Sequence, residues 1–134
     1  MIPLVSIYVG GALTLIMAIF HTRFYRMFNW KTDFDKGTVL NARIIYTVHL
    51  ALLLLFFMLG IISIVNAKEL AQSIGLALGL NLLFSVFWLW RLIWQFAYFK
   101  REKRQKIPLI GMILIFVFAL LFITYLIPVI YRFL

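Results

Sequence analysis

The stretch IPLIGMILIFVFALLFITYLIPVIY, residues 107–131, carries no charged side chain along its whole length. A helix needs about 20 apolar residues to cross a hydrocarbon core of about 30 Å, so this stretch is long enough to span a bilayer. Three further uncharged stretches precede it, at residues 2–22, 44–67 and 70–90. Together they predict an all-α polytopic membrane protein with four transmembrane helices in an up-down antiparallel bundle. Little of the chain remains for a second domain, so we expect one domain over residues 1–134.

The amino-acid composition agrees with this interpretation. Hydrophobic residues make up 66% of the chain and charged residues 13%, whereas about a quarter of the residues of soluble proteins are charged. Because Met1 is followed by apolar residues, without a basic region or a small-residue cleavage site, we expect the first stretch to be retained as a helix. The sequence contains no cysteine, which excludes disulfides, thiolate metal sites and cysteine nucleophiles.

The chain is strongly basic, with 13 Lys and Arg against 4 Asp and Glu. In a soluble protein this excess would suggest a nucleic-acid partner, but here the bases flank membrane helices, so we predict the lipid bilayer as partner and no nucleic acid. Most of the bases lie in two short segments. The first contains Arg23, Arg26, Lys31, Lys36 and Arg43, and the second contains Lys100, Arg101, Lys103, Arg104 and Lys106.

These two segments orient the protein in its membrane. The positive-inside rule places both of them in the cytoplasm and both chain termini outside, and the strong bias favours the plasma (inner) membrane of a bacterium. We expect the second basic segment to contact anionic lipids.

The connections between the stretches carry their own signals. Bases alternate with aromatic residues over residues 23–41, a composition suited to the headgroup region. Thr38 is expected to cap a helix that begins near Val39 and continues into the second span. The third span is expected to run to about residue 99. A short turn at Lys68 and Glu69 predicts that the second and third helices, at residues 44–67 and 70–99, are antiparallel neighbours.

Small residues predict where the helices pack, because helix association in lipid depends on close approach and on buried polar contacts. Gly75 and Gly79 form a GxxxG match in the third stretch, which predicts packing inside the bundle or with a partner. The other small or polar residues at helical spacing are Ser6, Gly10 and Thr14 in the first stretch, and Tyr46, His49, Gly60 and Ser63 in the second.

A polar stripe lies nearly opposite those glycines on the third helix. At about 100° per residue its members fall within an arc of roughly 140°. They are Asn81, Ser85, Trp88, Arg91, Gln95 and Tyr98. An intramembrane charge such as Arg91 is a functional candidate, and the alternative is a structural hydrogen-bond hub. Arg91, Asn81 and Gln95 can also form a site for an anion or a lipid headgroup, because guanidinium suits phosphate and carboxylate.

Two histidines complete the polar inventory of the spans. His21 ends the first stretch and His49 lies near the start of the second, so an antiparallel bundle can bring both into one cytoplasmic-side pocket with Arg91 and Gln95. Asn41, Tyr46 and Tyr98 would lie near its mouth. The histidines are candidates for bis-histidine haem ligation or for interfacial hydrogen bonding. No carboxylate lies within any span, so the histidines alone predict no firm metal site.

The run NARIIYTVH at residues 41–49 is combined with His21 and Trp30 before it and with Arg91, Gln95 and Tyr98 after it. This set resembles a pattern in small four-helix bacterial inner-membrane proteins of unknown function. The resemblance covers the whole chain and implies the four-helix architecture. It implies importance for His21, Asn41, His49, Arg91 and Gln95, and it names no reaction.

Arg91, Tyr98, Arg104 and Pro108 are placed as in the third helix and following loop of a second group. They are similar to positions in the membrane-associated eicosanoid and glutathione metabolism proteins, which are four-helix chains with basic cytoplasmic loops. That resemblance implies a trimer with glutathione between subunits, bound or activated by Arg91, Tyr98 and Arg104. The chain departs from the family where residues 44–49 replace the expected Asn and Glu.

The sequence favours a function in binding or assembly. No Asp or Glu lies in a span to carry a coupling ion, which argues against an ion-coupled transporter. No nucleophile with a base and no pair of carboxylates is visible there, which argues against an enzyme. We therefore expect an accessory subunit or a homo-oligomer with a polar pocket near the cytoplasmic leaflet. The alternatives are a haem-binding protein, a glutathione-dependent enzyme and an anion or lipid-headgroup carrier.

Overall fold

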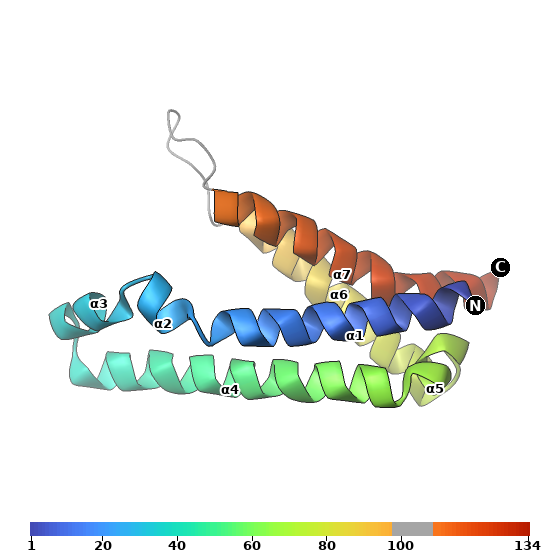
Figure 1. The fold of residues 1–134 in the computed structure, drawn as a ribbon, viewed down its shortest axis with the longest axis horizontal. Coiled ribbons are helices and arrows are strands. Elements are labelled where there is room, and N and C mark those ends of the chain that lie inside the picture. Colours follow the sequence, from blue (N-terminus) through green and yellow to red (C-terminus); the bar gives the residue numbers. More distant parts are fainter. Residues whose placement is uncertain (98–108) are drawn as a thin grey trace.

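A computed structural model describes residues 1–97 and 109–134 of the protein, and the ordered elements in this part of the chain are all helices (Figure 1). They are α1 (Ile2–His21), α2 (Phe24–Met27), α3 (Trp30–Lys36), α4 (Val39–Val65), α5 (Ala67–Gln72), α6 (Leu76–Ala97) and α7 (Leu109–Phe133). Four of them, α1, α4, α6 and α7, are long and apolar enough to cross a membrane. The predicted all-α class and the four candidate spans are confirmed.

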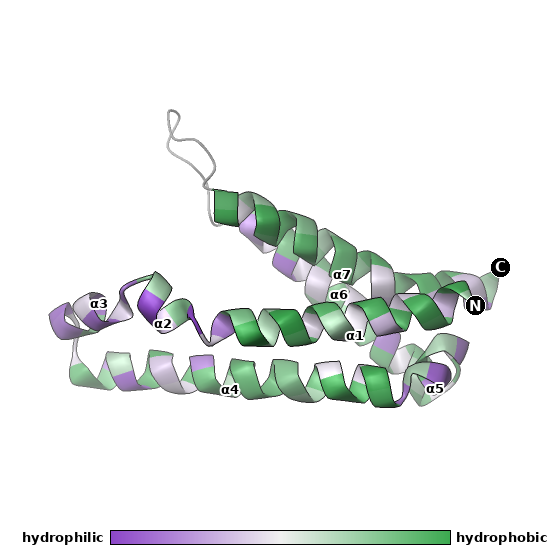
Figure 2. Ribbon diagram, viewed as in Figure 1, coloured by the Kyte–Doolittle hydropathy of each residue, from purple (hydrophilic) through white to green (hydrophobic). Residues whose placement is uncertain are grey.

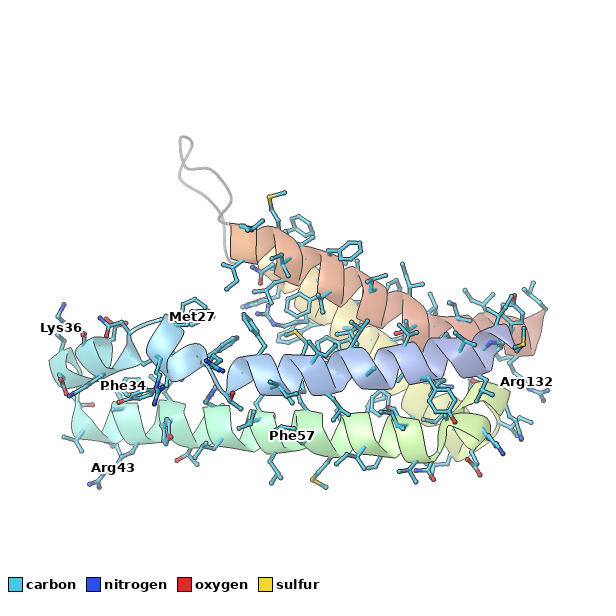
Figure 3. All side chains as sticks on the ribbon, viewed as in Figure 1. Met27, Phe34, Lys36, Arg43, Phe57 and Arg132 are labelled. Carbon is cyan, nitrogen blue, oxygen red and sulfur yellow. The ribbon has the colours of Figure 1, made fainter. Side chains whose placement is uncertain are left out.

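The polar residues gather at the ends of the long helices. Figure 2 shows apolar residues along most of α1, α4, α6 and α7, and hydrophilic residues concentrated in α2, α3 and the region of α5. Lys36 and Arg43 lie at the end that holds α3, and Arg132 lies at the opposite end, beside the chain termini (Figure 3).

The start of α4 matches the capping prediction. Thr38 is the N-cap residue, and its hydroxyl oxygen accepts a hydrogen bond from the Asn41 backbone N–H at 3.2 Å. This bond satisfies one of the amide groups that the first turn of a helix leaves without a partner. The helix therefore begins at Val39, ahead of the uncharged stretch that starts at Ile44.

The third uncharged stretch is not one helix, so the predicted span over residues 70–99 is wrong at its start. Lys68 and Glu69 lie inside α5 rather than in a turn, and the chain reverses after α5 instead. Ser73 and Gly75 both have a positive φ, of 51° and 55°, which a helix interior does not allow. The spanning helix α6 then begins at Leu76.

The inserted α5 changes which helices are neighbours. In the described part of the chain α1 packs against α4 and α7, and α6 packs against α7, while α4 and α6 have no extensive contact. The prediction that the second and third spans are neighbours is therefore wrong. The α6–α7 pair diverges from the α1–α4 pair toward the end that holds α2 and α3 (Figure 1). Phe56 of α4 nevertheless reaches α6, with its ring 5.4 Å from that of Trp88.

Glycines allow α1 and α4 to approach closely, but they are not the predicted pair. A Cβ atom on Gly11 would lie 3.1 Å from the Ser63 Cβ and 3.3 Å from the Gly60 carbonyl oxygen. By contrast, Gly79 has no atom within 4 Å of its Cβ position, and Gly75 lies in the turn before α6. The GxxxG match therefore makes no packing contact within the described chain.

Buried hydroxyl groups tie the core together. The Tyr125 hydroxyl on α7 lies 2.7 Å from the Ser63 hydroxyl on α4 and 3.4 Å from the Thr14 hydroxyl on α1. Thr14 also donates to the Gly10 carbonyl oxygen at 2.8 Å. These groups join three of the four long helices. The predicted faces point into the core at Ser6, Gly10 and Thr14 of α1 and at His49, Gly60 and Ser63 of α4, whereas Tyr46 is exposed.

Candidate functional site

His21 is the last residue of α1 and is largely buried, with 7% of its surface exposed. Its Nδ1 atom lies 2.8 Å from the carbonyl oxygen of Met17, one turn earlier in the same helix. The Phe24 ring, carried by the short helix α2, stacks against the imidazole with a centroid distance of 4.2 Å. His21 is thus held in place from both its own helix and the next one.

His49 faces His21 from α4. It is 8% exposed, and the two imidazole centroids are 5.9 Å apart with planes inclined by 20°. The edge of Trp30, from α3, lies against the His49 ring at 4.9 Å. The structure therefore brings the two predicted histidines together, under aromatic side chains supplied by the segment between α1 and α4.

The imidazole nitrogens retain unused hydrogen-bonding capacity. Within the described residues His49 makes no hydrogen bond, and His21 uses Nδ1 but not Nε2. Of the described side-chain nitrogen and oxygen atoms that have almost no exposed surface, Asn81 Oδ1 alone lacks a hydrogen-bond partner. The unpaired imidazole nitrogens are not among these atoms, so a water-sized molecule can reach them. Buried polar groups in proteins are normally paired. These nitrogens are placed to meet a ligand.

Arg91 and Gln95 approach this pair from α6. The Arg91 guanidinium lies over the Phe118 ring at 4.7 Å and donates from Nη1 to Gln95 Oε1 at 3.2 Å. Arg91 is half-buried, and its charge lies within electrostatic range of His21. The grouping of His21 and His49 with Arg91 and Gln95 stays a prediction, because the described contact of Gln95 is with Arg91 and not with a histidine.

Aromatic rings fill the space between the histidines and Arg91. Phe56 packs edge-on against His21 at 5.0 Å and contacts Trp88. The Trp88 ring in turn stacks on Phe118 at 5.8 Å, beneath the guanidinium of Arg91. The polar groups thus adjoin a cluster of aromatic rings contributed by α4, α6 and α7.

Asn81 does not belong to this group, which corrects its assignment to the pocket. It is fully buried near the start of α6, and its Nδ2 donates to the Leu70 carbonyl oxygen at 2.7 Å and to the Ser73 hydroxyl at 3.2 Å. Ten residues separate it from Arg91, or about 15 Å along the helix. Asn81 instead holds the turn between α5 and α6.

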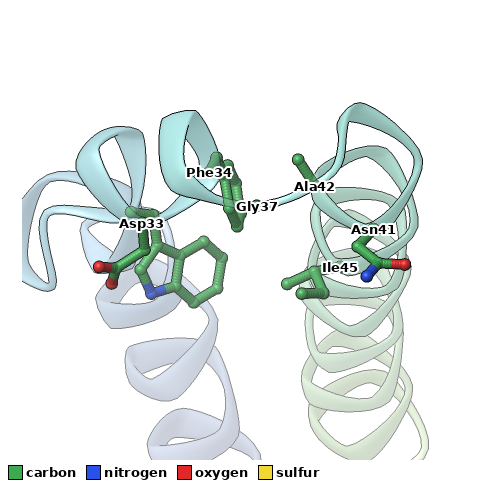
Figure 4. Close-up of a pocket in the computed structure, with 7 residues that line it drawn as sticks. Asp33, Phe34, Gly37, Asn41, Ala42 and Ile45 are labelled. Atoms are coloured by element: carbon green, nitrogen blue, oxygen red, sulfur yellow. The ribbon is translucent and has the colours of Figure 1, made fainter.

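Asn41 and Tyr46 lie apart from the histidines as well. Tyr46 is 42% exposed and contacts Tyr25 at 5.8 Å. Asn41 lines a separate hollow of about 420 Å³ between α3 and the start of α4, whose walls include Trp30, Phe34 and Ile45. Figure 4 shows Ala42 and Ile45 pointing across this hollow toward α3, whereas the Asn41 amide points away from it. Its lining is mostly apolar but includes Asp33.

The remaining predicted site residues lie outside the described part of the chain. They are Tyr98, Lys100, Arg101, Lys103, Arg104 and Lys106.

Comparison with family models, with curated proteins and with solved structures finds no match for this chain.

The two histidines fit a haem group poorly. Two axial imidazoles must leave a broad slot for the macrocycle between them. Here the Phe24 ring lies 4.2 Å from His21 and 5.8 Å from His49, with all three planes nearly parallel, so it occupies the approach to both. The described residues also contain no group of three or more His, Asp or Glu side chains that could hold a metal ion.

Sequence reasoning missed the aromatic residues that build the site. Phe24, Phe56 and Phe118 each contact one of the polar members, but they stand among many apolar residues in the sequence. Phe24 follows His21 by three residues, a helical spacing that is a usable signal. Phe56 and Phe118 give no such signal, because their contacts lie on other helices.

Proposed function

We propose that this protein is a small integral membrane protein that binds a ligand at the paired imidazoles of His21 and His49, with Arg91 nearby, in the cytoplasmic half of a four-helix bundle. The observation that carries the proposal is the pair of buried but reachable imidazoles, 5.9 Å apart, whose free nitrogens have no partner within the described chain. Because a water-sized molecule can reach these nitrogens, a ligand can replace water there and form hydrogen bonds with them.

The proposal includes a threading of the chain. The bases at Arg23, Arg26, Lys31 and Lys36 support a cytoplasmic position for α2 and α3. With four spans in an up-down arrangement, both termini and α5 then lie outside a bacterial inner membrane. The site near the α2 end of the bundle would open toward the cytoplasmic leaflet.

Single cysteines test the threading, since the natural chain has none. Lys36→Cys lies in α3 and Lys68→Cys in α5, and both positions are exposed. A membrane-impermeant maleimide should label Lys68→Cys on intact cells. It should label Lys36→Cys only after the cells are lysed. Labelling of Lys36→Cys in intact cells would reverse the orientation.

Native mass spectrometry tests the binding function. The protein is purified in mild detergent from its own membranes, and bound small molecules and lipids are identified by mass. We expect an adduct on the natural protein that is lost from His21→Asn and His49→Asn. Arg132→Gln, which removes a base at the opposite end of the bundle, should keep the adduct. An adduct retained by both site variants would contradict the proposal.

A further inference from the structure

His21 makes a hydrogen bond that is typical of histidine metal ligands. A carbonyl oxygen can only accept, so the contact of 2.8 Å between His21 Nδ1 and the Met17 carbonyl oxygen places the imidazole proton on Nδ1. In a neutral ring the other nitrogen, Nε2, then carries the lone pair. Histidines that bind metals in proteins almost always donate their second ring N–H to a carbonyl or carboxylate in this way, which fixes the ring and raises the basicity of the lone pair.

His49 lies beside His21 rather than stacked on its face. Phe24 lies on the face of His21 at 4.2 Å, and the centre of His49 is 5.8 Å from Phe24 and 5.9 Å from His21, with all three planes nearly parallel. Rings in face contact are about 3.5–4 Å apart, so a third layer of this stack would be about 7 Å from one of the other two rings. His49 therefore presents its edge, which carries its two nitrogens, to the stacked pair.

The space between the two imidazoles suits a metal ion. Ring bonds of about 1.35 Å place each nitrogen about 1.1 Å from the centre of its ring, so nitrogens of rings whose centres are 5.9 Å apart are separated by at least about 3.6 Å. This separation is too long for a direct hydrogen bond between the rings. A metal ion bound in line, at about 2 Å from each nitrogen, would hold the ring centres about 6 Å apart, which is close to the observed distance.

The number and charge of the available ligands select the ion. Two neutral imidazoles are too few for Zn²⁺, which takes four ligands in structural sites. The described residues offer no third His, Asp or Glu to the pair, and no carboxylate lies in the four candidate spans, so a divalent charge would stay uncompensated. Cu⁺ is satisfied by two nitrogen ligands in line and carries half that charge. Resting on the proposed binding function, we infer that His21 Nε2 and one nitrogen of His49 bind a single Cu⁺ ion.

The surroundings of the pair also favour a monovalent ion. Phe24 and Phe56 contact His21, and the edge of Trp30 lies against His49 at 4.9 Å, so aromatic rings take the place of the water ligands that a divalent ion would need. The positive charge of Arg91 lies within electrostatic range of His21 and repels a divalent ion about twice as strongly as a monovalent one.

Anaerobic titration of the detergent-purified full chain tests this inference. Cu⁺ is supplied with ascorbate and with bicinchoninate, a coloured chelator that competes for the ion, and Zn²⁺ is titrated separately. We expect one Cu⁺ per chain and an affinity for Cu⁺ at least about a hundredfold higher than for Zn²⁺, because Zn²⁺ would lack two of its four ligands. X-ray absorption of the copper complex should show two nitrogen neighbours at about 2 Å and the edge feature of linear Cu⁺.

Two variants locate the ion. His21→Asn and His49→Asn each remove one of the two ligands, so each should weaken Cu⁺ at least about a hundredfold, beyond the effect of losing a group that orients a ligand. Met58→Leu removes an exposed thioether, another soft group that can hold Cu⁺, and should leave the affinity unchanged. Because the two ions and the absorption spectrum are compared on the natural protein, the inference stays testable if a variant fails to fold.

The outcomes separate the inference from the proposed function. Equal affinities for Cu⁺ and Zn²⁺, more than two neighbours around the bound copper, or a Cu⁺ affinity that neither histidine substitution changes in folded protein would overturn the inference. If Cu⁺ does not bind, while the adduct of the natural protein is lost from His21→Asn and His49→Asn, the ion is wrong and the binding function stands. An adduct that both variants retain overturns the binding function itself.

Discussion

The hydroxyl groups of Ser63 and Tyr125 lie 2.7 Å apart in the interior of the bundle, and they join α4 to α7, helices that are not packed side by side. Tyr125 is almost fully buried, and its hydroxyl also approaches Thr14 on α1. One phenol oxygen thus connects three spans at a level where few other polar groups are available.

Removing that oxygen should weaken the bundle. Tyr125→Phe is expected to lower the free energy of unfolding by about 0.5–1.5 kcal/mol, because Ser63 and Thr14 lose a buried partner. Denaturant unfolding in detergent measures the change. Tyr131→Phe, at a residue that is 48% exposed, is the matched control and should have little effect. If Ser63→Ala and Tyr125→Phe are fully additive in the double variant, the two hydroxyls are not coupled.

The close approach of α1 and α4 predicts opposite outcomes for two glycines. Gly11→Ala should destabilise the protein by about 1–3 kcal/mol, because its Cβ would lie 2.8 Å from Ile64 Cγ1 and 3.1 Å from Ser63 Cβ. Gly79→Ala should be neutral, or stabilising by up to about 1 kcal/mol through helix propensity, since its Cβ meets no atom. Thermal unfolding of both variants in one detergent makes the comparison. A larger loss for Gly79→Ala would place a partner against α6.

The turn between α5 and α6 should depend on Asn81. Asn81→Ala leaves the buried Ser73 hydroxyl without its amide donor and removes the shorter of two hydrogen bonds to the Leu70 carbonyl oxygen, and we expect a loss of about 1–3 kcal/mol. Unfolding of Gln72→Ala, a change at an exposed neighbour in α5, provides the control. Equal stability of Asn81→Ala and the natural protein would mean that the positive-φ residues Ser73 and Gly75 form the turn unaided.

The packing around the histidines predicts an absorption spectrum without a Soret band, even when the protein is expressed with haem supply. The reason is steric, because Phe24 lies on His21 and Trp30 lies against His49. Oxidised and dithionite-reduced spectra of the purified protein decide the matter. A band that shifts on reduction and disappears in His21→Ala or His49→Ala would establish a haem protein and contradict the steric argument.

Part of the site could be predicted because helical periodicity is local. The polar stripe of α6 does face inward, with Asn81, Ser85 and Trp88 buried and Arg91 and Gln95 half-buried. Periodicity shows which residues share a face of the helix, but not whether two residues on that face belong to the same site. Asn81 shares the face of Arg91 but serves the turn at the other end of α6.

By itself the sequence determined the four candidate spans and the cap at Thr38, because the length of an apolar stretch and the bonding of a first helical turn are properties of contiguous residues. The tertiary structure decided that α5 separates α4 from α6. It also decided that Gly11 meets Gly60, whereas Gly75 and Gly79 do not pack together against another helix. Finally, it placed Phe24 and Phe56 against His21, and Phe118 under Arg91. In an apolar solvent every span has a hydrophobic surface, so hydropathy does not select among partners. That selection comes from the fit of small residues, aromatic rings and buried hydrogen bonds between segments far apart in the chain.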